Sequence, residues 1–243
     1  LIHTYSTPAT QAAYIATKDL PSPIPVVFGS MGDPLISGVV KDIQHTGTNV
    51  TGVASLSTQL TAKRLELLKE INPKIKRVAM PHTALAVGDA AATKSVEIAI
   101  DTAKRLDINL VFFPVSSKED NAPTSRRILR EDVDGIIVGG DSLVWGSIDE
   151  YIAQAIREKL PLAAFDFNQV KKGALVGFGP DYRVVGRQAA VITHQVLRGR
   201  RPEDIAVEVP QKLLLAANNA TARAIGITWP DKFLEKVDAF VGE

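Results

Sequence analysis

The feature that most constrains this fold is a short apolar run that stops at glycine and leads into a helix start, a pattern that recurs along the chain. One copy spans Ile24–Lys41 and reads IPVVFGSMGDPLISGVVK. Its β-branched beginning predicts a buried strand over residues 24–28. Asp33 and Pro34 then supply an N-cap residue and a proline suited to the first helical turn. Apolar residues follow at helical spacing, which predicts a helix over residues 34–44.

The remaining chain repeats this alternation. Further strands are expected over residues 1–5, 50–53, 76–80, 109–115, 134–138, 161–165, 174–178, 205–209 and 213–217. Helices are expected over residues 9–18, 89–106, 220–224 and 230–241, and after Ser57, Ser117, Ser147 and Asp181. Strands that alternate with helices of ordinary length indicate βαβ units and a mainly parallel sheet. The fold class is therefore α/β.

Composition limits the classes of protein that fit. A chain of 243 residues is long enough for one large α/β domain or two lobes. Its net charge of +1, with acids and bases interspersed, gives no electrostatic reason to expect nucleic acid or a membrane surface as a partner. The absence of cysteine excludes disulfides, thiol catalysis and zinc–thiolate sites. The apolar runs are too short to span a bilayer.

The common signatures of nucleotide and hydrolase chemistry are missing. The chain has no GxxxxGK[ST] phosphate loop, and the GSMG segment lacks the spacing of a GxSxG nucleophile turn. No two of the four histidines stand four residues apart, so nothing in their spacing supports a metal site. These patterns indicate no cofactor and no metal, and we expect neither.

Small or polar residues lie where four of the predicted strands end and helices begin: Ser6-Thr7, Gly29–Asp33, Gly140–Ser142 and Gly179–Asp181. Helix N-termini at the carboxyl ends of parallel strands point N–H groups at a ligand, so this pattern predicts a cleft for a small anionic or zwitterionic molecule. Aromatic residues near the same strand ends could stack on a flat ligand: Tyr5, Trp145, Phe165, Phe167 and Tyr182. The carboxylate pairs Asp33/Asp141 and Asp166/Asp181 allow either acid–base chemistry or binding of an ammonium group.

Three segments carry a resemblance to a known family: residues 24–79, which begin IPVVFGSMGDP; residues 171–210, which begin KKGALVGFGPDYRVVG; and residues 218–234, NNATARAIGITWPDKFL. Together they resemble the ABC-type solute-binding proteins that include tryptophan- and tyrosine-type binding lipoproteins. The resemblance implies a two-lobed type I periplasmic-binding fold, in which each lobe is a mainly parallel sheet flanked by helices and the lobes close on a small ligand.

The same resemblance implies the lobe boundaries. Residues 1–54 with 175–205 are expected to form lobe 1, and residues 55–174 with 206–243 to form lobe 2. Family members begin with a further strand, helix and strand before the position of Leu1, so lobe 1 is expected to lack its N-terminal βαβ portion.

The resemblance also implies a function and a site. The expected role is the extracytoplasmic solute-binding component of an ABC importer, which binds an amino acid or an aromatic carboxylate between the lobes without chemistry. Its partners would be the small-molecule ligand and the ABC permease. We expect a monomer in the periplasm or elsewhere outside the cytoplasm, with a lipid anchor allowed. The expected ligand-binding residues are Tyr5, Ser6, Thr7, Met31, Gly32, Asp33, His82, Thr83, Asp141, Phe165 and Asp166.

Two other functions stay open at this point. One is the effector-binding domain of a LacI-type regulator, although no basic helix-turn-helix segment is visible in the chain. The other is a doubly wound α/β enzyme that uses the carboxylates of Asp33 and Asp141, which would show turnover where a binding protein shows only saturable binding.

Overall fold

The computed structural model describes residues 1–243, which form two compact units. Unit 1 consists of Leu1–Ser57 and Pro180–Leu213, and unit 2 of Thr58–Gly179 and Leu214–Glu243. These bounds differ from the expected lobes at residues 175–179, which belong to unit 2, and at residues 206–213 and 55–57, which belong to unit 1. Backbone hydrogen bonds explain the difference at residues 206–213, because the N–H groups of Val207 and Glu208 donate to unit 1 carbonyls at 2.8 and 2.9 Å.

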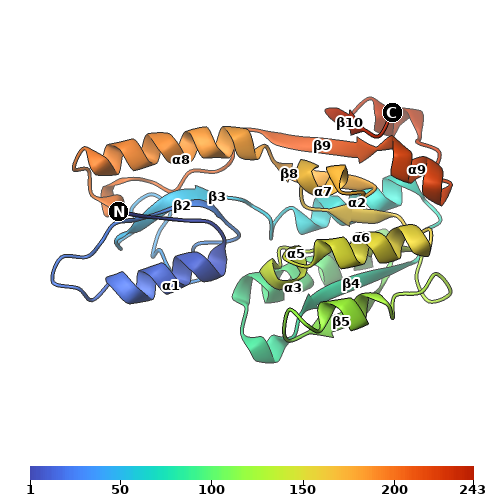
Figure 1. The fold of residues 1–243 in the computed structure, drawn as a ribbon, viewed down its shortest axis with the longest axis horizontal. Coiled ribbons are helices and arrows are strands. Elements are labelled where there is room, and N and C mark those ends of the chain that lie inside the picture. The colour runs from blue at the N-terminus through green and yellow to red at the C-terminus, as the bar shows by residue number, and fades with distance from the viewer. The chain divides into compact units, whose positions relative to one another are not determined.

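Unit 1 is built on a three-stranded parallel sheet in the order β1-β2-β3. The strands are β1 (Ile2–Thr4), β2 (Val26–Met31) and β3 (Val50–Ala54). Helix α1 (Thr7–Thr17) covers one face of this sheet and helix α8 (Tyr182–Leu197) covers the other (Figure 1).

The core of unit 1 follows the two-residue period of a strand. Val26 and Phe28 pack on the α1 side, while Val27, between them in sequence, packs with Val185 and Ile192 of α8. All of these side chains are buried. Both faces of the sheet are therefore covered, as the continuous apolar run of β2 predicts.

The expected helix over residues 34–44 does not form. The Oδ1 atom of Asp33 accepts hydrogen bonds from the N–H groups of Leu35 at 3.1 Å and Ile36 at 3.0 Å. The chain then leaves the helical region at Gly38, whose φ is +72°. Asp33 thus caps a local turn without a helix behind it, and β2 continues to Met31, three residues past the expected strand end.

The segment over residues 205–209, expected as a strand, is also different. A short 3₁₀ turn (Pro202–Asp204) precedes it, and Glu208 makes one isolated bridge to Val53 of β3.

Unit 2 contains a seven-stranded sheet in the order β10-β9-β8-β7-β6-β4-β5. Its strands are β4 (Arg77–Thr83), β5 (Asn109–Val115), β6 (Gly135–Ile137), β7 (Leu162–Ala164), β8 (Val176–Pro180), β9 (Leu213–Asn218) and β10 (Ala239–Val241). The recorded pairings of β4 with β5 and β6, and of β7 with β6 and β8, are parallel. The expected mainly parallel α/β architecture is confirmed.

Helices cover this second sheet as well (Figure 1). They are α2 (Thr61–Ile71), a 3₁₀ turn (Leu85–Val87), α3 (Ala90–Leu106), α4 (Asn121–Ser125), α5 (Ser142–Trp145), α6 (Ile148–Arg157), α7 (Phe167–Lys171), α9 (Asn219–Ile225) and α10 (Asp231–Leu234). Along β4, Val78 and Met80 join the core that includes α2 and α3, and Ala79 joins the core that includes α5 and α6. None of these helices combines the length and the hydropathy that a membrane span requires.

The last expected helix, over residues 230–241, is interrupted. Helix α10 ends at Leu234, and the chain then adds β10 in parallel to β9. The turn before β10 is fixed by Asp238, whose N–H donates to the carbonyl of Leu215 at 2.9 Å and whose Oδ2 accepts from the Leu215 N–H at 2.8 Å. A neighbouring strand edge outside this segment therefore decides its conformation.

Candidate functional site

Six of the expected ligand-binding residues lie at the carboxyl ends of β1 and β2. We call Tyr5, Ser6, Thr7, Met31, Gly32 and Asp33 the unit 1 cluster. β1 and β2 are adjacent and parallel, so the polypeptide leaves both strands at the same edge of the sheet. In open α/β sheets this edge is where ligands bind.

Hydrogen bonds join the two halves of the unit 1 cluster. The N–H of Ser6 donates to the carbonyl of Ser30 at 2.8 Å, and the N–H of Gly32 donates to Oγ1 of Thr7 at 3.3 Å. Ser6 holds a φ of +85°, an uncommon region for a residue other than glycine, and is the residue before α1. The position of the first N–H of α1, on Thr7, is therefore fixed by hydrogen bonds to the end of β2.

Tyr5 and Met31 have different environments within the unit 1 cluster. The side chain of Tyr5 is half exposed, and its ring centroid lies 5.9 Å from that of Tyr182 at an interplanar angle of 58°. Met31 is buried in the core, and its carbonyl accepts hydrogen bonds from the N–H and Oγ of Ser55. The Tyr5–Tyr182 pair is therefore partly exposed aromatic surface, whereas the Met31 side chain belongs to the core of unit 1.

The other five expected residues lie at strand ends of the second sheet. We call His82 and Thr83 at the end of β4, Asp141 after β6, and Phe165 and Asp166 after β7 the unit 2 cluster. β4, β6 and β7 are consecutive neighbours in the sheet, so these residues lie along one edge.

Asp141 joins the ends of β4 and β6. It is 3% exposed, and its carboxylate accepts hydrogen bonds from the N–H and Oγ1 of Thr83 at 2.5 and 2.9 Å. It also accepts from the N–H groups of Leu143 and Val144 at 3.0 Å each, which caps α5. Burial raises the pKa of the Asp141 carboxyl, and the hydrogen bonds oppose that rise. Through these four hydrogen bonds, the Asp141 carboxylate links the end of β4 to the start of α5.

Asp166 caps the N-terminus of α7 in the same way that Asp141 caps α5. Its Oδ1 accepts from the N–H groups of Asn168 at 2.7 Å and Gln169 at 3.1 Å, and the Trp145 side chain also donates to the carboxylate. Burial raises the pKa of Asp166, while these hydrogen bonds and the positive charge of Arg64 act in the opposite direction. This carboxylate has an aromatic ring donor on one side and a cation nearby.

Arg64 of α2 is a buried cation next to the unit 2 cluster, and sequence reasoning did not select it. Its guanidinium carbon lies 4.5 Å from the ring centroid of Phe165. Its Nε donates to the carbonyl of Phe178 at 3.2 Å, and its Nη1 to the carbonyl of Val138 at 3.5 Å. Its position in the sequence could have indicated its burial, because Arg64 shares a helical face with Leu67, Leu68 and Ile71, which are all core residues.

His82 is nearly buried against a ring. Its imidazole meets Phe112 edge to face, with 5.5 Å between centroids, and its Nδ1 lies 2.9 Å from the carbonyl of Thr83. No group of histidines and carboxylates in the chain could hold a metal ion.

Two glycines allow these strand ends to approach closely. A Cβ on Gly179 would lie 2.0 Å from the carbonyl oxygen of Phe165, and a Cβ on Gly140 would lie 2.7 Å from the backbone nitrogen of Thr58. Glycine is therefore required where β8 passes the turn between β7 and α7, and again just before Asp141.

The two expected carboxylate pairs are each divided between the units. Asp33 and Asp181 belong to unit 1, whereas Asp141 and Asp166 belong to unit 2. All four are local caps: Asp33 caps a turn, Asp141 caps α5, Asp166 caps α7, and Asp181 caps α8 through the N–H of Arg183. Their assignment to a ligand stays a prediction.

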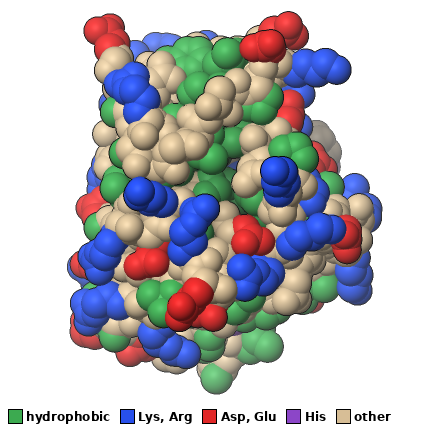
Figure 2. Space-filling view, turned by 90° about the vertical axis from the view of Figure 1, so that its right-hand side faces the viewer, with side chains coloured by type: hydrophobic (Ala, Val, Ile, Leu, Met, Phe, Trp, Pro, Cys, Tyr) green, Lys and Arg blue, Asp and Glu red, His purple; other side chains and the backbone are tan.

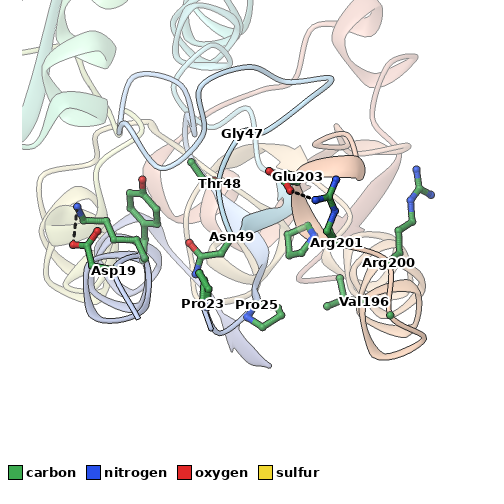
Figure 3. A pocket seen from close by; sticks show the side chains of 14 residues that line it. Asp19, Pro23, Pro25, Gly47, Thr48, Asn49, Val196, Arg200, Arg201 and Glu203 are labelled. Carbon is green, nitrogen blue, oxygen red and sulfur yellow. Dashed lines mark ion pairs between the residues drawn. The ribbon is translucent and has the colours of Figure 1, made fainter. Parts of the chain in front are cut away.

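A separate pocket of about 570 Å³ lies at the opposite ends of the unit 1 strands (Figure 3). Pro25, just before β2, and Asn49, just before β3, line it. Four of its charged side chains form two ion pairs, since Lys18 contacts Asp19 at 3.2 Å and Arg201 contacts Glu203 at 2.9 Å, and Arg200 bonds to the side-chain oxygen of Gln195 at 2.7 Å. The pocket is therefore lined by charges of both signs and is distinct from the strand-end clusters.

One face of the molecule carries charges of both signs, in keeping with the net charge of +1. Figure 2 shows Lys and Arg side chains interspersed with Asp and Glu over one face of the molecule. Mixed signs of this kind do not form the basic stripe typical of nucleic-acid binding.

The fold and the strand-end clusters define a class of protein: a two-unit, mainly parallel α/β binding protein with the type I periplasmic-binding fold. A conserved domain protein from Vibrio cholerae has this fold with a TM-score of 0.88 and 29% identity, covering 98% of this chain and 77% of that one. A Streptococcus pneumoniae ABC domain solved in complex with L-Trp matches with a TM-score of 0.86 and 26% identity, covering 99% of this chain and 80% of that one.

The family follows from the sequence as a whole. Residues 1–241 match the family described as ABC transporter substrate binding protein, and the chain belongs to it. The tyrosine-binding protein of Clostridioides difficile (strain R20291) is 31% identical over 226 residues. That alignment covers 93% of this chain and 62% of the relative, so the chain spans less than two thirds of that protein's length. The expected resemblance to tryptophan- and tyrosine-type binding proteins is confirmed.

Proposed function

We propose that this protein is the extracytoplasmic substrate-binding component of an ABC importer and that its ligand is an aromatic amino acid. The observation that carries the proposal is the family match over residues 1–241. Two relatives narrow the ligand class, since one is named a tyrosine-binding protein and another was solved in complex with L-Trp. Membership of this family favours binding for transport over the regulator and enzyme alternatives.

The strand-end clusters supply the three kinds of contact that such a ligand needs. The N–H of Thr7, at the start of α1, suits the α-carboxylate, because a helix N-terminus favours negative charge. The carboxylate of Asp166 suits the α-ammonium group. The half-exposed ring of Tyr5 offers aromatic surface to the ligand side chain, while the Phe165 ring is buried beside Arg64 at the end of β7. We expect the ligand to use both clusters.

Binding in this proposal involves no chemical step. The protein holds the amino acid, and closure about a hinge reports its occupancy to the membrane permease, a change known for periplasmic binding proteins. We propose that it acts as a monomer outside the cytoplasm, in the periplasm or held by a lipid anchor.

Calorimetric titration tests the proposal directly. Purified protein, unfolded and refolded to release any bound molecule, is titrated with L-Trp, L-Tyr, L-Leu and an aromatic acid without an amino group. We expect saturable one-to-one binding of L-Trp or L-Tyr, weaker binding of the other two, and recovery of unchanged ligand afterwards. Equal affinity for L-Leu would refute the aromatic assignment, and a chemically altered ligand would favour the enzyme alternative.

A further inference from the structure

Arg64 is a buried charge that the proposed function has not used. Its side chain is completely buried, and removing a guanidinium from water is costly unless hydrogen bonds and charges replace the water. In unit 2 these replacements come from strand-end groups: the carbonyls of Val138 and Phe178, the ring of Phe165 and the negative charge of Asp166. An arginine that served only to fill the core would be an expensive choice at this position.

We propose that Arg64 is a positioning residue of the ligand site, which holds the ring of Phe165, and with it the turn that leads to Asp166, in the arrangement that binds an amino acid. The proposal rests on the proposed function, because it assigns Phe165 and Asp166 to the ligand. Arg64 itself acts through these two neighbours.

The geometry explains how one side chain can set this turn. Phe165 and Asp166 are consecutive residues between β7 and α7, and Val138 and Phe178 belong to the segments on either side of β7. The guanidinium plane carries donors in fixed directions, so its bonds to the two carbonyls set the position at which it meets the Phe165 ring. The backbone of the turn is held in addition by the side-chain oxygen of Gln169, which accepts from the N–H of Phe165 at 2.8 Å.

The charge of Arg64 has a second effect, on the ionisation of Asp166. An amino acid's ammonium group needs the ionised carboxylate, and burial alone favours the protonated one. Asp166 faces Arg64 from α2 and the neutral Trp145 side chain from α5, in addition to the N–H groups of α7. At the neighbouring strand end, Asp141 faces Asp89 of the α3 N-terminus, and His82 packs on Phe112. The positive charge of Arg64 opposes the effect of burial, so it lowers the pKa of Asp166 relative to the same carboxyl without Arg64.

The test is the pH profile of L-Trp affinity, measured by calorimetry from about pH 4 to pH 8, a range that spans carboxyl and histidine titration. Arg64→Met removes the charge and keeps a long side chain. We expect about tenfold or greater loss of affinity at neutral pH, the order expected for a charged hydrogen-bonding group, together with an acidic limb displaced to higher pH. Arg64→Lys retains the charge, so its acidic limb should stay where the wild type has it while affinity falls because the planar group on Phe165 is lost.

Lys63→Met is the matched control, because Lys63 is the preceding residue of α2 and its side chain is exposed and paired with Glu66 at 3.6 Å. Lys63→Met should leave both the affinity for L-Trp and its pH dependence unchanged. Asp166→Asn provides the reference, since the loss of L-Trp affinity at acidic pH should disappear when residue 166 can no longer be protonated. If the wild-type protein binds L-Trp but Arg64→Met loses affinity equally at every pH, Arg64 is merely structural and the inference fails. Should Arg64→Met not fold, wild-type affinity in Arg64→Lys would overturn the inference. No L-Trp or L-Tyr binding by the wild type would instead refute the proposed function.

Discussion

Asp141 and Asp166 each follow a buried strand and cap a short helix, and burial dominates the electrostatics of both. Because burial raises their pKa values, each carboxyl binds a proton more tightly in the folded state than in the unfolded chain. Asp134 is the contrasting case. Burial would raise its pKa, but hydrogen bonds from the backbone N–H groups of Lys76 and Arg77 and from the Arg77 side chain lower it below the usual value.

These opposite shifts predict opposite pH dependences of stability. For Asp166, the wild-type free energy of unfolding relative to Asp166→Asn should decrease as pH rises from about 3.9, the unfolded value, through the higher folded pKa. For Asp134, the free energy of unfolding relative to Asp134→Asn should decrease as pH falls from about 3.9 through the lower folded pKa. Urea unfolding of the three proteins across acidic pH measures both slopes. Slopes of the same sign would contradict the assigned environments.

Thr7 allows a residue-scale test of the anion-binding end of α1. Thr7→Ala removes the hydroxyl that accepts from the Gly32 N–H, whereas Thr7→Pro removes the hydroxyl and the backbone N–H together. Proline is tolerated at the first helical position, so α1 should persist in both variants. We expect Thr7→Pro to bind L-Trp more weakly than Thr7→Ala by a further 1.5–3 kcal/mol, roughly the worth of a hydrogen bond to a charged group. Equal affinities of the two variants, measured by calorimetry, would place the ligand carboxylate elsewhere.

At the scale of the elements, the approach of β8 to the turn after β7 is the tightest contact near the unit 2 cluster. Gly179→Ala would place a methyl group 2.0 Å from the carbonyl oxygen of Phe165, so either β8 or the turn after β7 must shift. We expect this variant to lose roughly 1–3 kcal/mol of stability, as overpacking does, and to bind L-Trp less tightly because Phe165 and Asp166 move.

Gly186 provides the control within a helix. A Cβ there meets nothing within 4 Å, so Gly186→Ala in α8 should raise stability by roughly 0.5–1 kcal/mol and leave affinity unchanged. Thermal unfolding and calorimetry of the two variants provide both measurements. A Gly179→Ala protein with wild-type affinity would show that the turn after β7 is not part of the ligand site.

At the scale of the whole molecule, the chain passes between the units after Ser57, Gly179 and Leu213. Each unit has its own hydrophobic cores, so each can open separately in the absence of ligand. A ligand held by both clusters should protect both from opening. At about 100 times its Kd it should add about 2.7 kcal/mol to the free energy of unfolding.

Hydrogen exchange with and without L-Trp tests this expectation. We expect added protection around Thr7 in unit 1 and around Thr83 and Asp166 in unit 2, while the pocket lined by Pro25 and Asn49 stays unchanged. Protection confined to one unit would mean that the ligand uses one cluster alone.

Local sequence patterns determined the position of most strands and the fold class of this protein. Apolar runs with β-branched residues located most strands, and the alternation with helices required a parallel α/β fold, because side-chain period and capping are properties of neighbouring residues. The same patterns located Asp141 and Asp166, since a residue that follows a strand and precedes a helix lies at the ligand-binding edge of any parallel sheet.

Only the tertiary structure decided the rest. Residues 34–44 have helical spacing but form a turn, whose Ser37 carbonyl accepts a hydrogen bond from the side chain of Gln11 in α1 at 3.0 Å. Residues 239–241 become a strand because the edge of β9 is free to pair with them. Arg64 looks in the sequence like a misplaced charge on an apolar helix face. Its partners, Phe165 and Asp166, are about a hundred residues away along the chain, and only the packing of α2 against the strand ends brings the charge to them. Capping and periodicity are local, whereas pairing and charge burial depend on contacts between distant segments.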